Sequence, residues 1–264
     1  MPDSNATPAV LLDIDGVLHV GEEVIEGAIE ALSALREIAL GVRLLTNTTS
    51  KSRREIVAQL RRLGFAVDTE EVLTPAALAV RHCRERGHHR VKLLVAEALR
   101  EDLAELTPAE EDERVDAVVL GDLGDGFTPG VLNESFRMLL EGAELVALQH
   151  NRFWKRADGL VLDVGAYAAA LEYAGGVEAF VVGKPAAPFF TAALEDLDAP
   201  AESAVMVGDD LEADIGGAIA AGLRGILVRT GKYREETLEA SAVRPTEIVD
   251  SIADVPSLLG GATP

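Results

Sequence analysis

The chain has 264 residues, 48% of them hydrophobic and 26% charged, which is typical of a globular protein long enough for one large domain or two modest ones. Its 45 acidic residues outnumber its 24 basic residues and give a formal net charge of −21, so nucleic acids and anionic membranes are disfavoured as partners. Cys83 is the only cysteine, so no intrachain disulfide can form. Since no segment reads as a secretory leader or a membrane span, we expect a soluble cytoplasmic protein.

Short aliphatic runs alternate with segments of helical periodicity from the start of the chain. The pattern predicts a strand, a helix, a second strand and a second helix over residues 10–14, 28–39, 42–45 and 52–63. Gly41 follows the first helix, where we expect a left-handed cap, and Gly64 ends the second.

The same alternation continues to the end of the chain. Six later aliphatic runs are predicted to be buried strands, over residues 91–95, 115–120, 145–148, 179–182, 204–207 and 225–228. Helical patterns lie between most of them, which favours parallel sheets joined by right-handed crossovers. The predicted fold class is α/β, with a Rossmann-like parallel-sheet core.

Two loop signals suggest an insertion in this core. One is Leu73-Thr74-Pro75 and the other is Gly175-Gly176, and each lies beside a predicted strand. The prediction is a core domain made of residues 1–74 and 178–264, with a second α/β domain inserted over residues 75–177.

Polar side chains follow four of the predicted strands, where ligands bind in open parallel sheets. They are Asp13 and Asp15, then Thr46 and Asn47, then Lys184, and finally Asp209, Asp210 and Asp214. The carboxyl ends of parallel strands meet at one edge of a sheet, so these side chains are expected to converge.

This set of side chains is suited to a metal ion and a phosphoryl group. Asp13, Asp15 and Asp209 offer the hard oxygen ligands that Mg²⁺ prefers. Thr46 and Lys184 would supply a hydrogen bond and a positive charge to the oxygens of a phosphoryl group. Two carboxylates at the end of a buried strand also need a cation to offset their repulsion.

Four motifs carry a family resemblance in their order along the chain. "LLDIDGVL", "LLTNTTS", "VVGKP" and "VGDDLEADI" resemble the four motifs of the haloacid dehalogenase superfamily of phosphohydrolases. The long segment between the second and third motifs resembles the α/β cap of the subclass that includes p-nitrophenylphosphatases. The resemblance implies a Rossmann-like core that performs the reaction and an inserted α/β cap that selects the substrate.

The resemblance assigns the reacting groups to the first motif. Asp13 would be the nucleophile that forms an aspartyl phosphate. Asp15 would act first as the general acid and then as the general base, while its backbone carbonyl helps to bind Mg²⁺. The segment "VLHVGEEV" that follows Gly16 would form a flap over the site.

The other three motifs would bind phosphate and metal. Thr46 and Asn47 would hold the phosphate, and Lys184 would bridge the phosphate and Asp13. Asp209 would complete the Mg²⁺ site, and Asp214 would orient water or Lys184. The expected substrate is a small phosphorylated metabolite. The motifs indicate its phosphate group and do not distinguish among such metabolites.

Two other classes of protein use similar residues. A phospho-receiver signalling module also places acidic residues, Thr and Lys around Mg²⁺ on a doubly wound sheet, but this chain is much longer than a lone receiver. A nucleotide-sugar glycosyltransferase would use Asp13-Ile14-Asp15 as its metal site, which leaves Lys184 and Asp209 without a role.

One histidine-rich segment, "RHCRERGHHR", suggests zinc because it contains His82, Cys83, His88 and His89. Its spacing matches no common structural zinc pattern. The surrounding arginines favour a solvated helix end instead.

A second segment in the predicted cap, "NRFWKRADG", holds Trp154 beside Lys155 and Arg156. These residues would suit an anionic or planar substrate, packing within the cap, or a contact between two copies of the chain. A homodimer through the cap is therefore one expectation.

Overall fold

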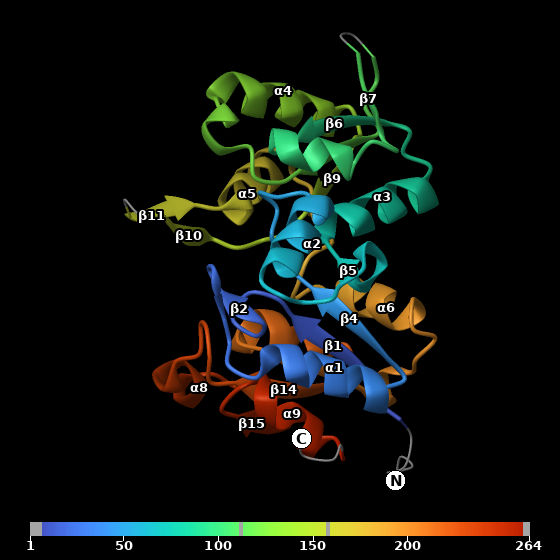
Figure 1. Ribbon diagram of the computed structural model, residues 1–264. Helices are drawn as coiled ribbons and strands as arrows, with labels where there is room; N and C mark the ends of the chain where they lie inside the picture. The colour runs from blue at the N-terminus through green and yellow to red at the C-terminus, as the bar shows by residue number, and fades with distance from the viewer. Residues whose placement is uncertain (1–6, 111–112, 157–158, 261–264) are drawn as a thin grey trace. The chain divides into compact units, whose positions relative to one another are not determined.

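The computed structural model describes residues 7–110, 113–156 and 159–260, with residues 154–156 described by their backbone. They divide into two compact units. The first unit consists of Met1–Thr46, Ile56–Leu73 and Lys184–Pro264, and the second of Asn47–Glu55 and Thr74–Gly183. Each unit is built around its own parallel sheet (Figure 1).

The strands of the first unit are β1 (Ala9–Asp13), β2 (His19–Val20), β3 (Glu23–Val24), β4 (Gly41–Leu45), β5 (Val72–Leu73), β13 (Ala204–Gly208), β14 (Arg224–Val228) and β15 (Glu247–Val249). Its helices are α1 (Ala28–Ile38), α2 (Arg53–Arg62), which starts in residues of the second unit, α6 (Ala187–Glu195), α7 (Gly217–Ala220), α8 (Glu235–Ala240) and α9 (Val255–Leu258). The second unit contains β6 (Arg90–Leu94), β7 (Thr107–Pro108), β8 (Ala117–Leu120), β9 (Glu144–Ala147), β10 (Phe153–Arg156), β11 (Gly159–Leu162), β12 (Phe180–Val181), α3 (Pro75–Arg86), α4 (Pro129–Leu140) and α5 (Val164–Gly175).

The sheet of the first unit has six parallel strands in the order β15-β14-β13-β1-β4-β5. All residues of β1 and β13 are buried, since both strands lie inside the sheet. Asp13 is the last residue of β1 and pairs with Leu45 at the end of β4. The chain leaves β1, β4 and β13 at the same edge of the sheet, and that edge positions the polar residues described below.

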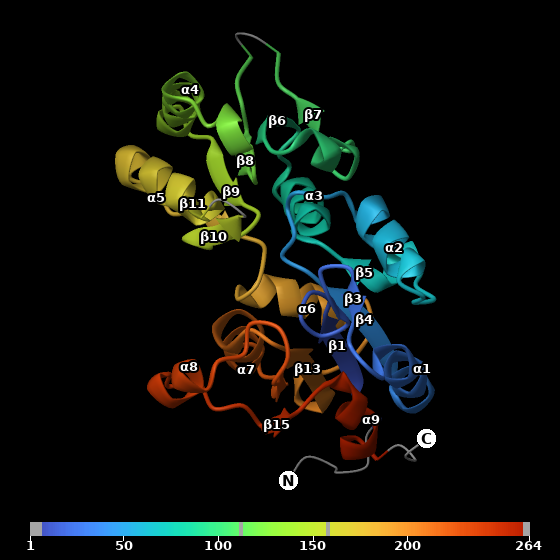
Figure 2. The same ribbon diagram turned by 60° about the vertical axis from the view of Figure 1, so that its left-hand side comes forward.

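Helices cover both faces of this sheet. Figure 2 shows α1 and α9 on one side of β1 and β13, and α6 and α7 on the other. α1 buries Ala28, Ala31, Leu32 and Leu35, a spacing of three and four residues that forms one apolar face. These side chains join aliphatic residues of β1, β4 and β13 in one hydrophobic core.

The two glycines that follow the predicted helices differ in their conformation. Gly64, which ends α2, has a positive φ of 98°. Gly41 lies outside that region and begins β4, so the prediction of a left-handed cap there is wrong. A Cβ atom at Gly41 would lie 2.6 Å from Leu197 Cδ2, so a larger residue at this position would require the Leu197 side chain to move.

The second unit has a five-stranded parallel sheet in the order β12-β9-β8-β6-β7. In Figure 2, α4 and α5 lie on one side of β8 and β9, and α3 lies on the other. Thr74 accepts a hydrogen bond from the Ala77 amide and Pro75 occupies the first turn, so α3 begins with a side-chain cap.

One predicted strand lies in a different unit from the one expected. The sequence assigned residues 178 onward to the core, but β12 pairs with β9, and the second unit extends to Gly183. An aliphatic run predicts burial in a sheet without specifying which sheet, and that choice depends on pairing. The α/β fold class itself is confirmed.

The described helices include none with both the length and the apolar character needed to cross a lipid bilayer.

Candidate active site

A buried lysine joins two carboxylates at the edge of the first unit's sheet. Lys184 Nζ lies 2.5 Å from Asp13 Oδ1 and 2.7 Å from Asp214 Oδ1. All three side chains are less than a tenth exposed. Burial opposes the ammonium charge, but the attraction of Asp13 and Asp214 outweighs it and raises the pKa of Lys184 above its usual range. Lys184 is therefore a fixed cation at the end of β1.

Asp209 follows β13 and brings a third carboxylate to this cluster. One carboxylate oxygen each from Asp13, Asp209 and Asp214 lies within 4.8 Å of the others. Asp209 Oδ2 accepts a hydrogen bond from the Lys232 amide at 2.7 Å. Asp209 Oδ1 is buried and has no hydrogen-bond partner among the described residues. A buried, unpaired carboxylate oxygen is a costly feature that a bound cation would satisfy.

The pKa shifts of Asp13 and Asp209 also favour a bound cation at this cluster. Burial, followed by repulsion from Asp214 and Asp209, raises the pKa of Asp13 well above its usual value despite Lys184. Burial is also the main reason that the pKa of Asp209 rises to about 6. Three carboxylates face one ammonium, so the ionised cluster carries excess negative charge. A divalent cation with hard oxygen ligands, such as Mg²⁺, fits this donor set.

The loop after β14 closes around Asp209. Thr230 Oγ1 donates a hydrogen bond to the Gly16 carbonyl, and the next two residues pack on the Asp209 carboxylate. A Cβ atom at Gly16, whose φ is 93°, would lie 1.9 Å from Asp209 Oδ2, and one at Gly231 would do the same. Both positions therefore require glycine for the close approach of the backbone to this carboxylate.

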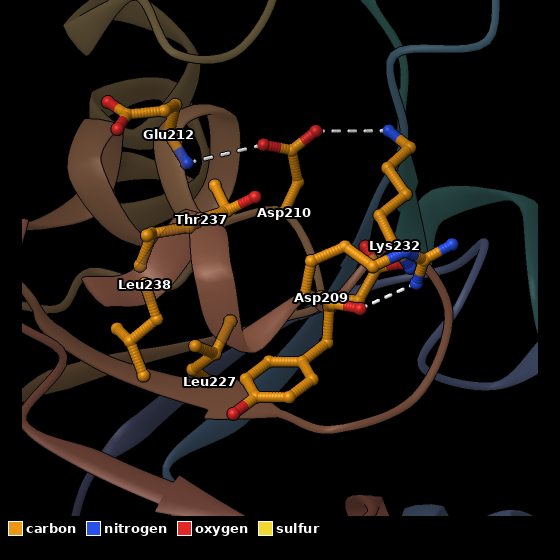
Figure 3. Close-up of a pocket in the computed structure, with 10 residues that line it drawn as sticks. Asp209, Asp210, Glu212, Leu227, Lys232, Thr237 and Leu238 are labelled. Atoms are coloured by element: carbon orange, nitrogen blue, oxygen red, sulfur yellow. Dashed lines mark hydrogen bonds and ion pairs between the residues drawn. The ribbon is translucent and has the colours of Figure 1, made fainter. Parts of the chain in front are cut away.

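A cavity of about 120 Å³ adjoins Asp209 and Asp210 (Figure 3). Figure 3 shows the Asp210 carboxylate between the Glu212 amide and the Lys232 ammonium, which lie 3.2 and 3.1 Å away. The Asp210 amide in turn donates to Asp214 Oδ2 at 3.1 Å. Asp210 thus caps the π-type turn Leu211–Gly216 and helps to hold Asp214 toward Lys184.

Asp15 differs from the buried carboxylates in its exposure. Its side chain is 60% exposed, whereas Asp13 is buried two residues earlier. The neighbouring His19 is buried, with Nε2 4.0 Å from Asp15 Oδ1, and its carbonyl accepts a hydrogen bond from the Gly16 amide. The Asp15 carboxylate is therefore reachable from solvent, while the turn and His19 restrict its position.

The second motif places its two candidate residues in different surroundings. Thr46 is buried directly after β4, and its amide donates to the Leu73 carbonyl at 3.3 Å. Asn47 belongs to the second unit, where its Oδ1 lies beside Gly183. The first unit thus contains Asp13, Asp15, Thr46, Lys184, Asp209 and Asp214, whereas Asn47 belongs to the second. Of these residues, Asp13, Lys184, Asp209 and Asp214 form the buried cluster.

Sequence reasoning missed four residues of the site. Thr230, Gly231 and Lys232 follow β14, so the same strand-end rule would have identified them. His19 follows the first motif directly but carries no spacing signal. Its role beside Asp15 becomes visible only in the turn.

Two further predictions concern the second unit. The expectation of a solvated helix end is wrong for His82 and His88, which are mostly buried, whereas His89 is exposed. Their side chains contact Glu144 at the start of β9. The side chains of Trp154, Lys155 and Arg156 lie outside the described residues.

Two family models match the chain. A model described as haloacid dehalogenase-like hydrolase matches residues 10–107, and a second model of haloacid-dehalogenase-hydrolase-like type matches residues 181–255. The first covers Asp13, Asp15 and Thr46, and the second covers Lys184, Asp209 and Asp214. The two matches therefore fall on the segments that supply the buried cluster.

Individual relatives extend the similarity to almost the whole chain. Phospholysine phosphohistidine inorganic pyrophosphate phosphatase of Rattus norvegicus is 41% identical over 95% of this chain and 93% of its own length. The solved structure of p-nitrophenyl phosphatase from Archaeoglobus fulgidus has a TM-score of 0.88 at 26% identity, covering 96% of this chain and 99% of that one. Glycerol phosphate phosphatase from Mycobacterium tuberculosis in complex with magnesium has a TM-score of 0.82 at 32% identity, covering 94% of this chain and 77% of that one. The chain therefore belongs to the haloacid dehalogenase-like hydrolase family, as an enzyme of its phosphatase type.

Proposed function

We propose that the protein is a Mg²⁺-dependent phosphatase that hydrolyses a small-molecule phosphate monoester through an aspartyl phosphate at Asp13. The observation that carries this proposal is the buried cluster of Asp13, Lys184, Asp209 and Asp214, in which Asp209 Oδ1 has no hydrogen-bond partner within the described part of the chain. Such a cluster suits a divalent cation and a phosphoryl group, since both need opposite charge in a site that excludes water.

The reaction divides into two displacements at phosphorus. In the first, an Asp13 carboxylate oxygen bonds to phosphorus, the bond to the leaving oxygen breaks, and Asp15 gives that oxygen a proton. In the second, water attacks the phosphoryl group, returns a proton to Asp15 and frees the Asp13 carboxylate. The products are an alcohol and inorganic phosphate, and Asp13 and Asp15 recover their starting states.

The remaining residues bind and orient. Lys184 holds Asp13 in place and offers positive charge to the phosphoryl oxygens, while Thr46 and Asn47 supply hydrogen-bonding groups. Asp214 keeps Lys184 in position through its ion pair. Asp13, Asp209 and the Asp15 carbonyl would hold Mg²⁺, which neutralises charge on the carboxylates and the phosphoryl group.

The test is hydrolysis of p-nitrophenyl phosphate by protein freed of metal and then titrated with Mg²⁺. Turnover should require Mg²⁺ and stop with EDTA, and Asp13→Asn should reduce kcat by about 10⁴-fold or more. Lys51→Met, which changes an exposed lysine, serves as the control and should retain full activity. Metal-independent turnover, or an Asp13→Asn variant at the wild-type rate, would overturn the proposal.

The comparisons do not favour the two alternative functions. The matched models and the relatives named above are hydrolases and phosphatases, not receiver modules or glycosyltransferases. A stable phosphoprotein that never turns over would support the receiver alternative. Single-turnover trapping of phosphorylated Asp13, followed by its decay in the presence of Mg²⁺, separates the two.

We also propose that residues 75–177 act as a cap that selects the substrate. In support, the second unit has a cavity of about 260 Å³ whose lining includes Asp122, Asp125, Phe127 and Tyr167. Phe127 and Tyr167 stack with ring centres 3.7 Å apart, which gives this cavity a rigid aromatic wall. A panel of phosphorylated metabolites should show a spread of kcat/KM values, and Tyr167→Ala should change their ranking while leaving the requirement for Mg²⁺ intact.

A homodimer through the second unit and a cytoplasmic location complete the proposal. The ribbon of β10 and β11 exposes Phe153, Leu160 and Leu162, which is unusual for large apolar side chains. Sedimentation of the wild type as a dimer and of Leu160→Lys as a monomer would support the interface. The cytoplasmic location rests on Cys83, a lone buried thiol that forms no disulfide among the described residues.

A further inference from the structure

Two histidines and a glutamate from three separate segments converge in the second unit. His82 lies in the last turns of α3, His88 lies in the connection to β6, and Glu144 is the first residue of β9. His82 Nε2 lies 3.2 Å and His88 Nε2 lies 2.5 Å from the same atom, Glu144 Oε2. Candidate ligand atoms of the three residues all lie within 4.8 Å of one another.

The surroundings hold the three side chains in this arrangement. The side chains of His82, His88 and Glu144 are 12, 17 and 22% exposed, so the ligand atoms are partly shielded but reachable from solvent. The His82 ring stacks on Phe180 of β12, with centroids 3.8 Å apart and planes at 11°. His82 can therefore direct Nε2 toward Glu144 with little rotational freedom.

The charges of the three side chains allow them to bind a cation. Burial opposes the charge of Glu144, but hydrogen bonds from His88 and His82 outweigh it, and the pKa of this carboxyl lies below its usual value. Arg86 Nε lies 3.7 Å from Glu144 Oε2, but its side chain is 62% exposed and can turn into solvent. The carboxylate is thus ionised and faces two imidazole nitrogens that can each donate either a proton or a lone pair.

We propose that His82, His88 and Glu144 form a binding site for a transition-metal dication of the Zn²⁺ type, separate from the magnesium site of the first unit. Imidazole nitrogens select zinc and its neighbours over Mg²⁺, which prefers oxygen. Zn²⁺ bonded to nitrogen and oxygen at about 2.0–2.2 Å in a tetrahedron places its ligand atoms roughly 3.3 Å apart. The contact between His82 and Glu144 already has this length, and that between His88 and Glu144 needs to open by less than an ångström.

Metal binding here replaces protons on the two imidazole nitrogens. The Nε2 atoms of His82 and His88 both lie beside Glu144 Oε2. To bind the ion through its lone pair, each Nε2 must release its proton to solvent or carry the proton on Nδ1 instead. Three protein ligands leave one tetrahedral position for water. The ion would join α3, the connection between α3 and β6, and the start of β9, so its expected effect is to stabilise the fold of the second unit.

The experiment measures Zn²⁺ binding by calorimetry in the Asp209→Asn protein with excess Mg²⁺, so that the acidic cluster of the first unit contributes little. One Zn²⁺ per chain should bind in the micromolar range or tighter. His88→Ala and Glu144→Gln should each weaken binding by about 100-fold. Co²⁺ should give the visible absorption of a tetrahedral nitrogen and oxygen site, and the same variants should abolish it.

The matched control is His150→Ala. His150 Nε2 lies 3.4 Å from Glu172 Oε2, a histidine–glutamate pair that belongs to no three-residue ligand cluster among the described residues. This variant should bind Zn²⁺ like the parent. Glu144→Gln keeps the size of the side chain, and circular dichroism verifies that it is folded.

Two results would overturn the proposal. One is the absence of a stoichiometric Zn²⁺ site in the folded parent protein. The other is binding that His88→Ala and Glu144→Gln leave unchanged, since the ion would then be held elsewhere. Neither result bears on hydrolysis of p-nitrophenyl phosphate, so the proposed phosphatase function is tested independently.

Discussion

Lys184 shows how one residue makes the crowded acidic site possible. It is one of five lysines in the chain, and it is almost wholly buried between Asp13 and Asp214. A buried ammonium is tolerated because two carboxylates surround it, and its positive charge in turn offsets part of the repulsion between them. Removing it leaves two buried carboxyl groups without the ammonium that lies between them.

We predict that Lys184→Met lowers the free energy of unfolding of metal-free protein by about 3–5 kcal/mol at neutral pH. The loss should shrink in acid, because Asp13, whose pKa is already raised, then takes up a proton. Lys232→Met is the control, since that side chain is 67% exposed and its pair with Asp210 contributes less than about 1 kcal/mol. Urea unfolding with EDTA present measures both, and equal losses in the two variants would contradict the prediction.

The raised pKa of Asp209 predicts that metal binding depends on pH. Its pKa rises from an ordinary 3.8 to about 6 in the fold. The proton on Asp209 therefore contributes stability that is fully present below about pH 3.8 and is lost as the pH rises through about 6. The proposed Mg²⁺ would bind the ionised carboxylate, so it should restore stability mainly above that pH.

The expected result is that saturating Mg²⁺ raises the melting temperature roughly 3–6 °C more above pH 6 than below it. Asp209→Asn should lose most of this difference, because its amide neither titrates nor attracts the ion. Thermal unfolding at matched ionic strength measures the effect. The same Mg²⁺ shift on both sides of pH 6 would count against the assignment of Asp209 as a metal ligand.

At the scale of elements, an ion pair between Arg36 and Glu71 connects α1 to the turn that precedes β5. Arg36 donates two hydrogen bonds to Glu71 Oε1, at 3.1 and 2.8 Å, and one to Oε2 at 2.9 Å. Glu71 Oε2 also accepts from the Asp68 amide at 2.8 Å. The pair is less than a third exposed, so solvent screens it only in part.

Glu71→Gln should therefore lower the free energy of unfolding by about 1–3 kcal/mol, because the guanidinium loses its charged, forked acceptor. Glu85→Gln, which changes the exposed pair with Arg81, should leave stability almost unchanged. Chemical denaturation compares the two variants. Equal losses of unfolding free energy in the two variants would contradict a stabilising role for the Arg36–Glu71 ion pair.

At the scale of the whole molecule, each unit has its own hydrophobic core. The core of the first unit contains side chains of β1, β4, β13 and β14, and a separate core contains those of β8, β9, α4 and α5. A ligand that binds only the folded form of one unit stabilises that unit by mass action. The free energy of local opening in the other unit then stays the same.

Hydrogen exchange should show this separation. Saturating Mg²⁺ is expected to slow amide exchange at least about tenfold in β1, β13 and the loop 229–234, and to leave β8 and β9 near their metal-free rates. Mass spectrometry of peptides with and without Mg²⁺ measures both regions at once. Uniform protection of both sheets would show that the two cores open together.

The sequence alone determined the α/β class and the chemical character of the site. Aliphatic runs and helical periodicity are local patterns, and they predicted strands within two residues of β1, β4, β6, β8, β9, β13 and β14. Ligand-bearing residues in parallel sheets follow strands, so Asp13, Thr46, Lys184 and Asp209 could be selected before any contact was known.

Only the tertiary structure decided which of these residues touch, because contacts depend on strand order and register, which alternation does not encode. It placed β12 beside β9 in the second unit, put the loop of Thr230 and Lys232 on Asp209, and made Gly41 a site of close packing. It also joined His82 and His88 to Glu144, more than fifty residues away in the chain. Local sequence specifies which groups are available, and the pairing of distant segments specifies which of them act together.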